Sequence, residues 1–180
     1  MWTPYPLDEM TKTLADIRTF GDPVLKERAK EVMAYDDRLE RLAAVMTEVM
    51  DKEEGVGLAA TQVGILSRVI VWRHPDDEER LHAFVNPEIA ERSETCTAAT
   101  EGCLSVPGAS VEVTRSDEVL VVAQGLKGES LEMRLTGMAA RIVQHEIDHL
   151  DGMLILDRTS PDERRRVMKE LRERKLAEET

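Results

Sequence analysis

The 180-residue sequence has few cysteines, 3% aromatic residues and no long hydrophobic run. Its two cysteines, Cys96 and Cys103, are too few for a disulfide framework and do not form a CxxC pair. No apolar stretch approaches the ~20 residues that a membrane-spanning helix needs. The N-terminal residues include Asp8 and Glu9 and lack the basic start and apolar stretch of a signal peptide. These absences predict a cytoplasmic protein with no membrane partner.

An excess of basic charge is also absent, since 24 basic and 36 acidic residues give a net charge of −12. An anionic surface repels phosphate backbones, so DNA is not an expected partner. One local exception is a basic cluster near the C-terminus. It consists of Arg164, Arg165, Arg166, Lys169, Arg172, Arg174 and Lys175.

The pattern along the chain predicts a single α+β domain over residues 1–180, because no repeat or linker divides it. Apolar residues recur at helical spacing over residues 36–52, which predicts an amphipathic helix near the N-terminus. Thr136 is an expected N-cap for a second helix, and Ser160 begins a capping box for a C-terminal helix over about 161–178. Strands are expected at 68–73 and 81–85, and a hairpin pairs 118–123 with 130–135. The second helix should be central, packed against small, mainly antiparallel sheets.

That central helix contains the motif His145-Glu146-Ile147-Asp148-His149, an HExxH sequence. Spacing of i and i+4 places both imidazoles on one helical face, where they can bind one divalent metal ion. Glu146 points about a quarter-turn away, so it is positioned to act on water as a general base. The alternative is a helix whose histidines only pack, but the apolar surroundings favour a metal site.

Two histidines need a third protein ligand to form a hydrolytic metal site. The metzincin pattern would place that ligand at Ile155, which cannot bind metal. Glu170 follows at a spacing seen in other peptidases, but it lies among charges where a solvated carboxylate is expected. Cys103 is the upstream candidate, since a thiolate would complete a His2Cys site. From the residues alone, a small buried cysteine is an equally good interpretation of Cys103, and Cys96 has no setting for a ligand.

A third segment, residues 55–62, reads GVGLAATQ and is not a phosphate-binding loop, because it lacks the Lys-Ser/Thr ending. Its glycines allow a close backbone approach, and Gln62 offers an amide donor. A plain loop before a packed apolar segment explains the same residues.

Taken together, GVGLAATQ, EGCLSVP and QHEIDH resemble, in this order, the three signature motifs of the peptide deformylase family. The resemblance extends from about Ile17 to the C-terminal helix. It implies a metal-dependent hydrolase that removes the formyl group from N-formylmethionyl nascent polypeptides and releases formate.

The resemblance also implies roles for particular residues. Cys103, His145 and His149 would be the metal ligands, and Glu146 would move the proton. The Gln62 amide and the Leu104 backbone N–H would stabilise the oxyanion. The residues expected to border the peptide are Val56, Gly57 and Gly102.

The metal and the partners follow from the same resemblance. The family generally uses Fe²⁺, and Zn²⁺, Ni²⁺ or Co²⁺ are also accepted. Ser110, Arg141 and Ile142 depart from residues found in some members, which leaves side-chain preference beyond methionine open. The basic C-terminal helix is a candidate for docking on the ribosome, although a solvated helix with internal salt bridges explains it too. The alternatives are an HExxH peptidase using Glu170 and a non-catalytic binding protein.

Overall fold

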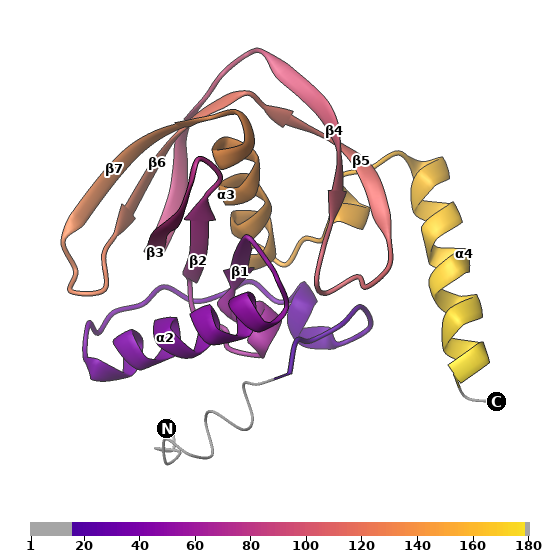
Figure 1. The fold of residues 1–180 in the computed structure, drawn as a ribbon, viewed down its shortest axis with the longest axis horizontal. Helices are drawn as coiled ribbons and strands as arrows, with labels where there is room; N and C mark the ends of the chain where they lie inside the picture. The colour runs from indigo at the N-terminus through magenta and orange to yellow at the C-terminus, as the bar shows by residue number, and fades with distance from the viewer. Residues whose placement is uncertain (1–15, 179–180) are drawn as a thin grey trace.

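A computed structural model describes residues 16–178, so the N-terminal residues used above to argue against a signal peptide lie outside it. The helices are η1 (Pro23–Lys26), α2 (Asp37–Lys52), η2 (Ala60–Val63), α3 (Gly137–Leu150), η3 (Ile155–Asp157) and α4 (Pro161–Glu178), where η marks a 3₁₀ helix. The strands are β1 (Gly57–Ala59), β2 (Val69–His74), β3 (Asp77–Arg92), β4 (Cys96–Gly102), β5 (Ser110–Ser116), β6 (Glu118–Gln124) and β7 (Ser130–Thr136). The α+β class is confirmed (Figure 1).

A five-stranded antiparallel sheet in the order β1-β2-β3-β6-β7 separates two helices. Successive side chains of a strand point to opposite faces. Ile70 and Trp72 of β2 pack in the cluster that contains the apolar residues of α3. Val69 and Val71 pack with those of α2. This alternation places α3 and α2 on opposite faces of the sheet and makes α3 the central helix.

The strand predicted at 81–85 is part of a longer element, β3, which spans Asp77–Arg92. Its pairing shifts register between Val85 and Glu88, opposite β6. Asn86 in this bulge has a φ of 50°, and its side-chain oxygen accepts a hydrogen bond from the Val32 N–H at 2.8 Å. Asn-Pro reads as a strand end in the sequence, but a bulge accommodates Pro87 within the strand.

A second, two-stranded sheet pairs β4 with β5 and was not predicted. Most residues of β4 are exposed, so its sequence lacks a clear apolar alternation. The Gly102–Ser110 pair ends this ladder, and Cys103 follows directly. In Figure 1, strands β4 and β5 lie on the side of α3 that is opposite the larger sheet. Cys103, the candidate metal ligand, is therefore positioned next to α3 by a sheet that is separate from the larger one.

The helix starts agree with the predictions in position and differ in detail. The α3 helix begins after Thr136, whose side chain makes no capping hydrogen bond. At α4, the Glu163 N–H donates to Ser160 Oγ at 3.2 Å, as predicted. The Glu163 carboxylate instead accepts from Thr159 Oγ1 at 2.7 Å, so only half of the capping box forms. Among residues 16–178, no helix combines the length and the apolar character that crossing a bilayer requires.

Candidate metal centre

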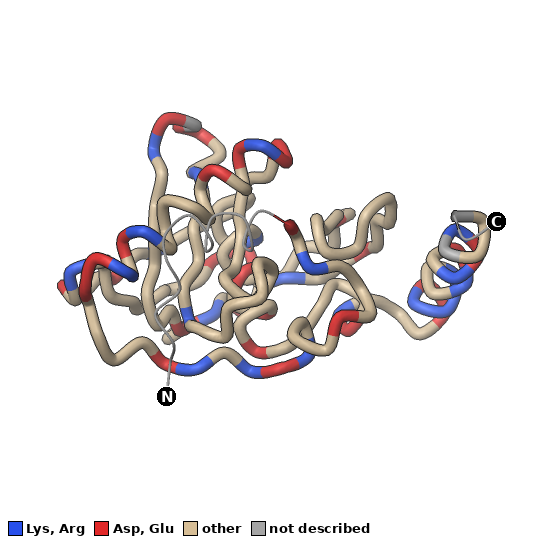
Figure 2. The backbone as a smooth tube through the Cα atoms, turned by 90° about the horizontal axis from the view of Figure 1, so that it is seen from below, with Lys and Arg blue, Asp and Glu red and all other residues tan. Residues whose placement is uncertain are grey.

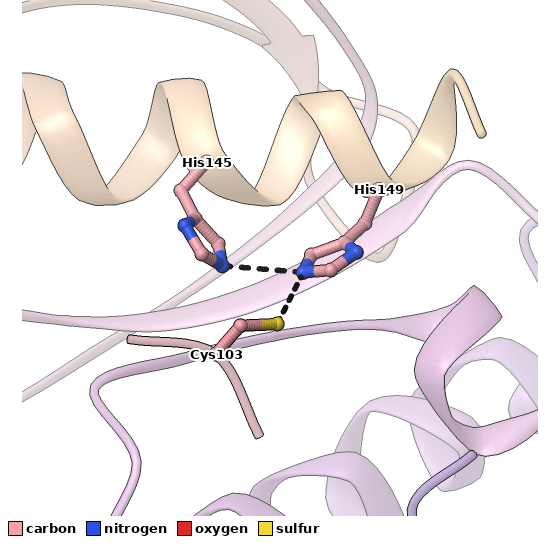
Figure 3. Close-up of side chains that lie close together, drawn as sticks. All are labelled: Cys103, His145 and His149. Atoms are coloured by element: carbon pink, nitrogen blue, oxygen red, sulfur yellow. Dashed lines mark hydrogen bonds between the residues drawn. The ribbon is translucent and has the colours of Figure 1, made fainter. Parts of the chain in front are cut away.

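Three donor atoms converge between the end of β4 and the inner face of α3 (Figure 3). Cys103 Sγ lies 3.3 Å from His149 Nε2. His149 Nε2 lies 3.2 Å from His145 Nε2. All three atoms are within 4.8 Å of one another, and no other group of three His, Cys, Asp or Glu donors in the described range does this.

The donor set fits one divalent cation. Two ligands about 2.1 Å from a tetrahedral ion lie roughly 3.4 Å apart, close to the spacing of these atoms. Thiolate and imidazole donors together favour borderline metals such as zinc and ferrous iron over magnesium or calcium. The residues could therefore hold a single transition-metal ion with a further coordination position for a small molecule.

The orientation of His145 is fixed by a carboxylate behind it. Its Nδ1–H donates to Glu101 Oε2 at 3.0 Å, which leaves Nε2 facing Cys103 and His149. Arg115 donates to both oxygens of Glu101, at 2.7 and 2.9 Å. Such a partner fixes the tautomer of a ligating histidine and raises its basicity.

The two histidines have opposite electrostatic settings. Burial opposes a charge on His145, but its hydrogen bonds to Cys103 and Glu101 outweigh this and raise its pKa to about 10. Burial and the neighbouring His145 lower the pKa of His149 well below its ordinary value. A cation bound here would displace the proton of His145, so metal binding is coupled to proton release.

Glu146 is buried beside the donor atoms and faces β1. It is 4% exposed, and its Oε2 has no hydrogen-bond partner among the described residues. Burial raises its pKa to about 7, against the opposing effect of His145. A Cβ at Gly57 would lie 2.5 Å from Glu146 Oε1, so glycine is required where β1 passes this carboxyl group. A carboxyl group with a pKa near neutrality can both accept and return a proton.

Gln62 lies in η2 with its amide turned toward Cys103. Its Oε1 accepts from the Ala59 N–H at 2.9 Å. Its Nε2 donates to Ser105 Oγ at 3.2 Å and lies 3.9 Å from Cys103 Sγ. The amide nitrogen is thereby directed toward the metal ligands, where a donor could stabilise negative charge on a substrate oxygen.

A cavity of about 760 Å³ opens onto these groups. Val56 and Met138, at 58% and 57% exposed, lie among its lining residues and present apolar side chains to solvent. Apart from the buried His149, the structure brings every site residue expected from the sequence to this cavity. These residues are Val56, Gly57, Gln62, Gly102, Cys103, Leu104, His145 and Glu146.

The alternative ligand does not reach the centre. Glu170 is on α4, where its Oε1 accepts from Arg166 Nη1 at 2.9 Å, and it is not part of the three-donor group. Cys96 is exposed in β4. Ser110 and Arg141, which depart from some family members, both line the cavity.

The sequence did not predict the buried charged residues that surround Glu101 behind the site. Arg115 bridges Glu101 and Asp148, with Nη1 2.7 Å from Asp148 Oδ2. Arg141 Nη1 also donates to Glu101 Oε1 at 2.7 Å. Two signals were available: Glu101 lies two residues before Cys103, and Arg115 follows Val111 and Val113 at alternate positions of β5, which places it on their buried face.

The site combines a thiolate that follows β4 with two imidazoles from α3, and it lies beside a buried carboxyl group and an open cavity. These features together define a metal-dependent hydrolase. Residues 14–165 match the family described as polypeptide deformylase. The peptide deformylase of Thermotoga petrophila is 49% identical over 155 residues, which cover 86% of this chain and 93% of the relative. The chain belongs to the polypeptide deformylase family, whose members remove the formyl group from nascent polypeptides.

Solved structures agree with this membership. The crystal structure of peptide deformylase from Thermotoga maritima is 48% identical, with a TM-score of 0.76 and coverage of 81% of this chain and 97% of that chain. The structure of a peptide deformylase from Legionella pneumophila is 36% identical, with a TM-score of 0.84 and coverage of 91% and 96%.

Proposed function

We propose that Cys103, His145 and His149 hold the cation of this deformylase and that Glu146 and Gln62 act on the formyl group. One observation supports this assignment above all: the three donor atoms lie within 4.8 Å of one another. They do so beside the cavity that Gln62 and Glu146 also line. When bound, the cation supplies Lewis acidity toward the formyl carbonyl and the attacking water. We propose Fe²⁺ as the native ion from the family resemblance, with Zn²⁺, Ni²⁺ or Co²⁺ as replacements, since a His2Cys donor set suits all four and does not select one.

Glu146 moves the proton in this assignment. It takes a proton from the attacking water as the new C–O bond forms. It then delivers that proton to the α-amine as the C–N bond breaks, and formate leaves. Its raised pKa, about 7, supports both directions of transfer.

The oxyanion that forms during attack needs donors already in position. Gln62 Nε2 and the Leu104 backbone N–H are the assigned donors, and both residues line the cavity. Val56, Gly57 and Gly102 border the same cavity and are assigned to bind the peptide in an extended conformation.

The test is hydrolysis of formyl-Met-Ala-Ser by the full chain, followed by formate detection. Cys103→Ala should lose the metal and the activity, because the site loses a thiolate ligand. The matched control Cys96→Ala should keep both, since Cys96 is exposed and distant from the centre. Full metal content and activity in Cys103→Ala, with loss of both in Glu170→Ala, would overturn the ligand assignment.

We also propose that α4 docks on the ribosome, in the cytoplasm, where the substrate emerges. Figure 2 shows Lys and Arg positions along α4, at the end of the molecule that carries the C-terminus. Several of them pair within the helix, as Arg166 does with Glu163 and Glu170. Solvation with internal ion pairs is therefore the competing explanation.

Co-sedimentation with ribosomes at low and high salt separates these explanations. Arg165→Glu/Arg172→Glu should abolish salt-sensitive binding, because phosphate contacts depend on basic charge. The control Arg38→Glu/Lys52→Glu makes the same change in charge on α2. If both double variants bind equally well, α4 is not the docking element.

A further inference from the structure

Ser105 has a buried hydroxyl group in contact with the amide of Gln62. The residue is 0% exposed, and its Oγ accepts from Gln62 Nε2 at 3.2 Å. We infer that Ser105 is a positioning residue for Gln62, whose orientation it fixes so that one amide N–H remains directed at the formyl oxygen. This inference rests on the proposed role of Gln62 as an oxyanion donor.

The hydrogen bonds of the amide account for each of its groups. The Ala59 N–H donates to Oε1 and thereby identifies the oxygen side of the amide. Ser105 occupies one of the two N–H groups of Nε2. Within residues 16–178, the one further hydrogen-bond partner of Nε2 is Cys103 Sγ, at 3.9 Å, which is a weak contact. That second N–H is therefore available to a substrate oxygen at little cost.

The distance between the two side chains is held by the backbone. The Arg18 N–H donates to the Gln62 carbonyl at 2.7 Å, and the Phe20 N–H donates to the Ser105 carbonyl at 2.7 Å. Residues 18–20 thus connect two segments that are 43 residues apart in the sequence. Ser105 and Gln62 are fixed relative to each other before any substrate binds.

Loss of the hydroxyl would remove one of the contacts that orient the amide and leave the hydrogen bond from the Ala59 N–H to Oε1, at 2.9 Å. The terminal torsion of glutamine is broad, so the side chain is oriented by its partners more than by rotamer preference. With Ser105→Ala, Nε2 loses its oxygen acceptor and can turn toward the Cys103 sulfur. Complete loss of an oxyanion donor lowers turnover about 10²–10³-fold, and loss of its orientation should give a part of that, about tenfold.

The experiment measures kcat and KM of the metal-loaded enzyme for Ser105→Ala, Gln62→Ala and the double variant. We expect Ser105→Ala to lower kcat about tenfold with KM changed less than twofold. In the Gln62→Ala background the same change should have no further effect on kcat, because its target is gone. Ser105→Thr keeps a hydroxyl and should restore most of kcat.

A second measurement is independent of turnover. In the zinc-loaded protein, the two side-chain N–H resonances of Gln62 should differ clearly in chemical shift. In Ser105→Ala this difference should become smaller. Metal content should be unchanged in every variant. Thr47→Val is the control, since it removes a partly buried hydroxyl that bonds the Ala43 carbonyl in α2, and it should leave kcat and these resonances unaltered.

The outcomes distinguish the role of Gln62 from the role of Ser105. If Gln62→Ala lowers kcat and Ser105→Ala lowers it equally in both backgrounds, Gln62 keeps its role and the positioning role of Ser105 is overturned. A normal kcat in Ser105→Ala overturns the positioning role as well. If Gln62→Ala itself has a normal kcat, the proposed role of Gln62 fails and the role of Ser105 fails with it.

Discussion

Helices α3 and α4 both carry charged residues, few on α3 and many on α4, and hold them in opposite environments. On α3, Arg141, Glu146 and Asp148 are at most 9% exposed. On α4, the side chains of Arg165 and Arg166 are 72% and 51% exposed. A charge in the interior is tolerated only when it is paired or needed for chemistry, whereas a charge on the surface has little effect on stability.

The two helices also differ in how they are packed against the rest of the protein. The α3 helix packs its apolar residues against the main sheet and turns Arg141 and Asp148 toward the smaller one, whereas Glu146 faces β1. The α4 helix lies at the edge of the molecule (Figure 1) and is fixed mainly by Val167, with Met168 and Leu171 beside it. Substitutions on α3 should therefore affect catalysis and folding, and those on α4 should mainly affect the helix itself.

The largest contrast is expected between two carboxyl groups. Glu146→Ala should keep the metal and lower kcat about 10²–10⁴-fold, because the proposed general base is removed. Glu170→Ala, the control on α4, should retain normal turnover. Formate release and metal content decide this comparison, and near-normal turnover in Glu146→Ala would remove the distinction between the helices.

The next contrast concerns ion pairs and the free energy of unfolding. Asp148 accepts from Arg115 at 2.7 Å and from Arg158 Nη2 at 2.6 Å. Asp148→Asn should destabilise the fold by about 3 kcal/mol, because it leaves Arg115 short of a buried partner. Arg166→Ala breaks exposed pairs with two glutamates and should change stability far less than Asp148→Asn does. Denaturant unfolding measures both, and equal effects would contradict the comparison.

A smaller effect is expected at the anchor of α4. Val167 is fully buried, so Val167→Ala should reduce stability by roughly 2 kcal/mol through lost contacts and a cavity. Limited proteolysis should then cut α4 sooner, while kcat stays within twofold. Met33→Ala, at a position that is 84% exposed, provides the control. Unchanged proteolysis in Val167→Ala would show that α4 is held by other contacts.

The smallest effect is expected at Asp157, which pairs with Lys26 at 2.5 Å and with Arg164 of α4 at 3.3 Å. Burial would raise the pKa of Asp157, but hydrogen bonds from Lys26 and the Leu154 N–H outweigh it and lower the pKa. Its contribution to stability is therefore present above the unfolded pKa of ~3.9 and is lost as the pH falls through the lower folded value. Asp157→Asn should be less stable than the parent by under ~1 kcal/mol at pH 7, and the difference should disappear as the pH falls below the lowered pKa of Asp157. A difference that persists at low pH would exclude this origin.

The sequence predicted the elements whose signal is local. Periodic apolar residues located α2, glycine-containing turn residues located the hairpin of β6 and β7, and the i, i+4 spacing placed His145 and His149 on one face. These features depend on neighbours in the chain, so one segment is enough to predict them. Strand β3 was predicted too short because a bulge accommodates Pro87 inside it.

Contacts between segments that are far apart in the chain were harder to predict from the sequence. No spacing rule connects Cys103 to the histidines, and only the family resemblance indicated that they meet. The alternation of β5 places Arg115 on the buried face, but its pairing with Glu101 and Asp148 depends on segments that are distant in the chain. Its burial follows from how the smaller sheet packs on α3.

The separation of the ligands along the chain has a consequence for folding. Cys103 and His149 are 46 residues apart, so an unfolded chain offers the cation at most the two histidines. An ion that binds the native state far better than the unfolded state stabilises it by about 2.7 kcal/mol at a free concentration 100 times its dissociation constant. Chelation then shifts the chain toward unfolding just as a denaturant does. With Cys103, His145 and His149 as the proposed ligands, the supply of the ion would contribute to the stability of the folded protein as well as to its activity.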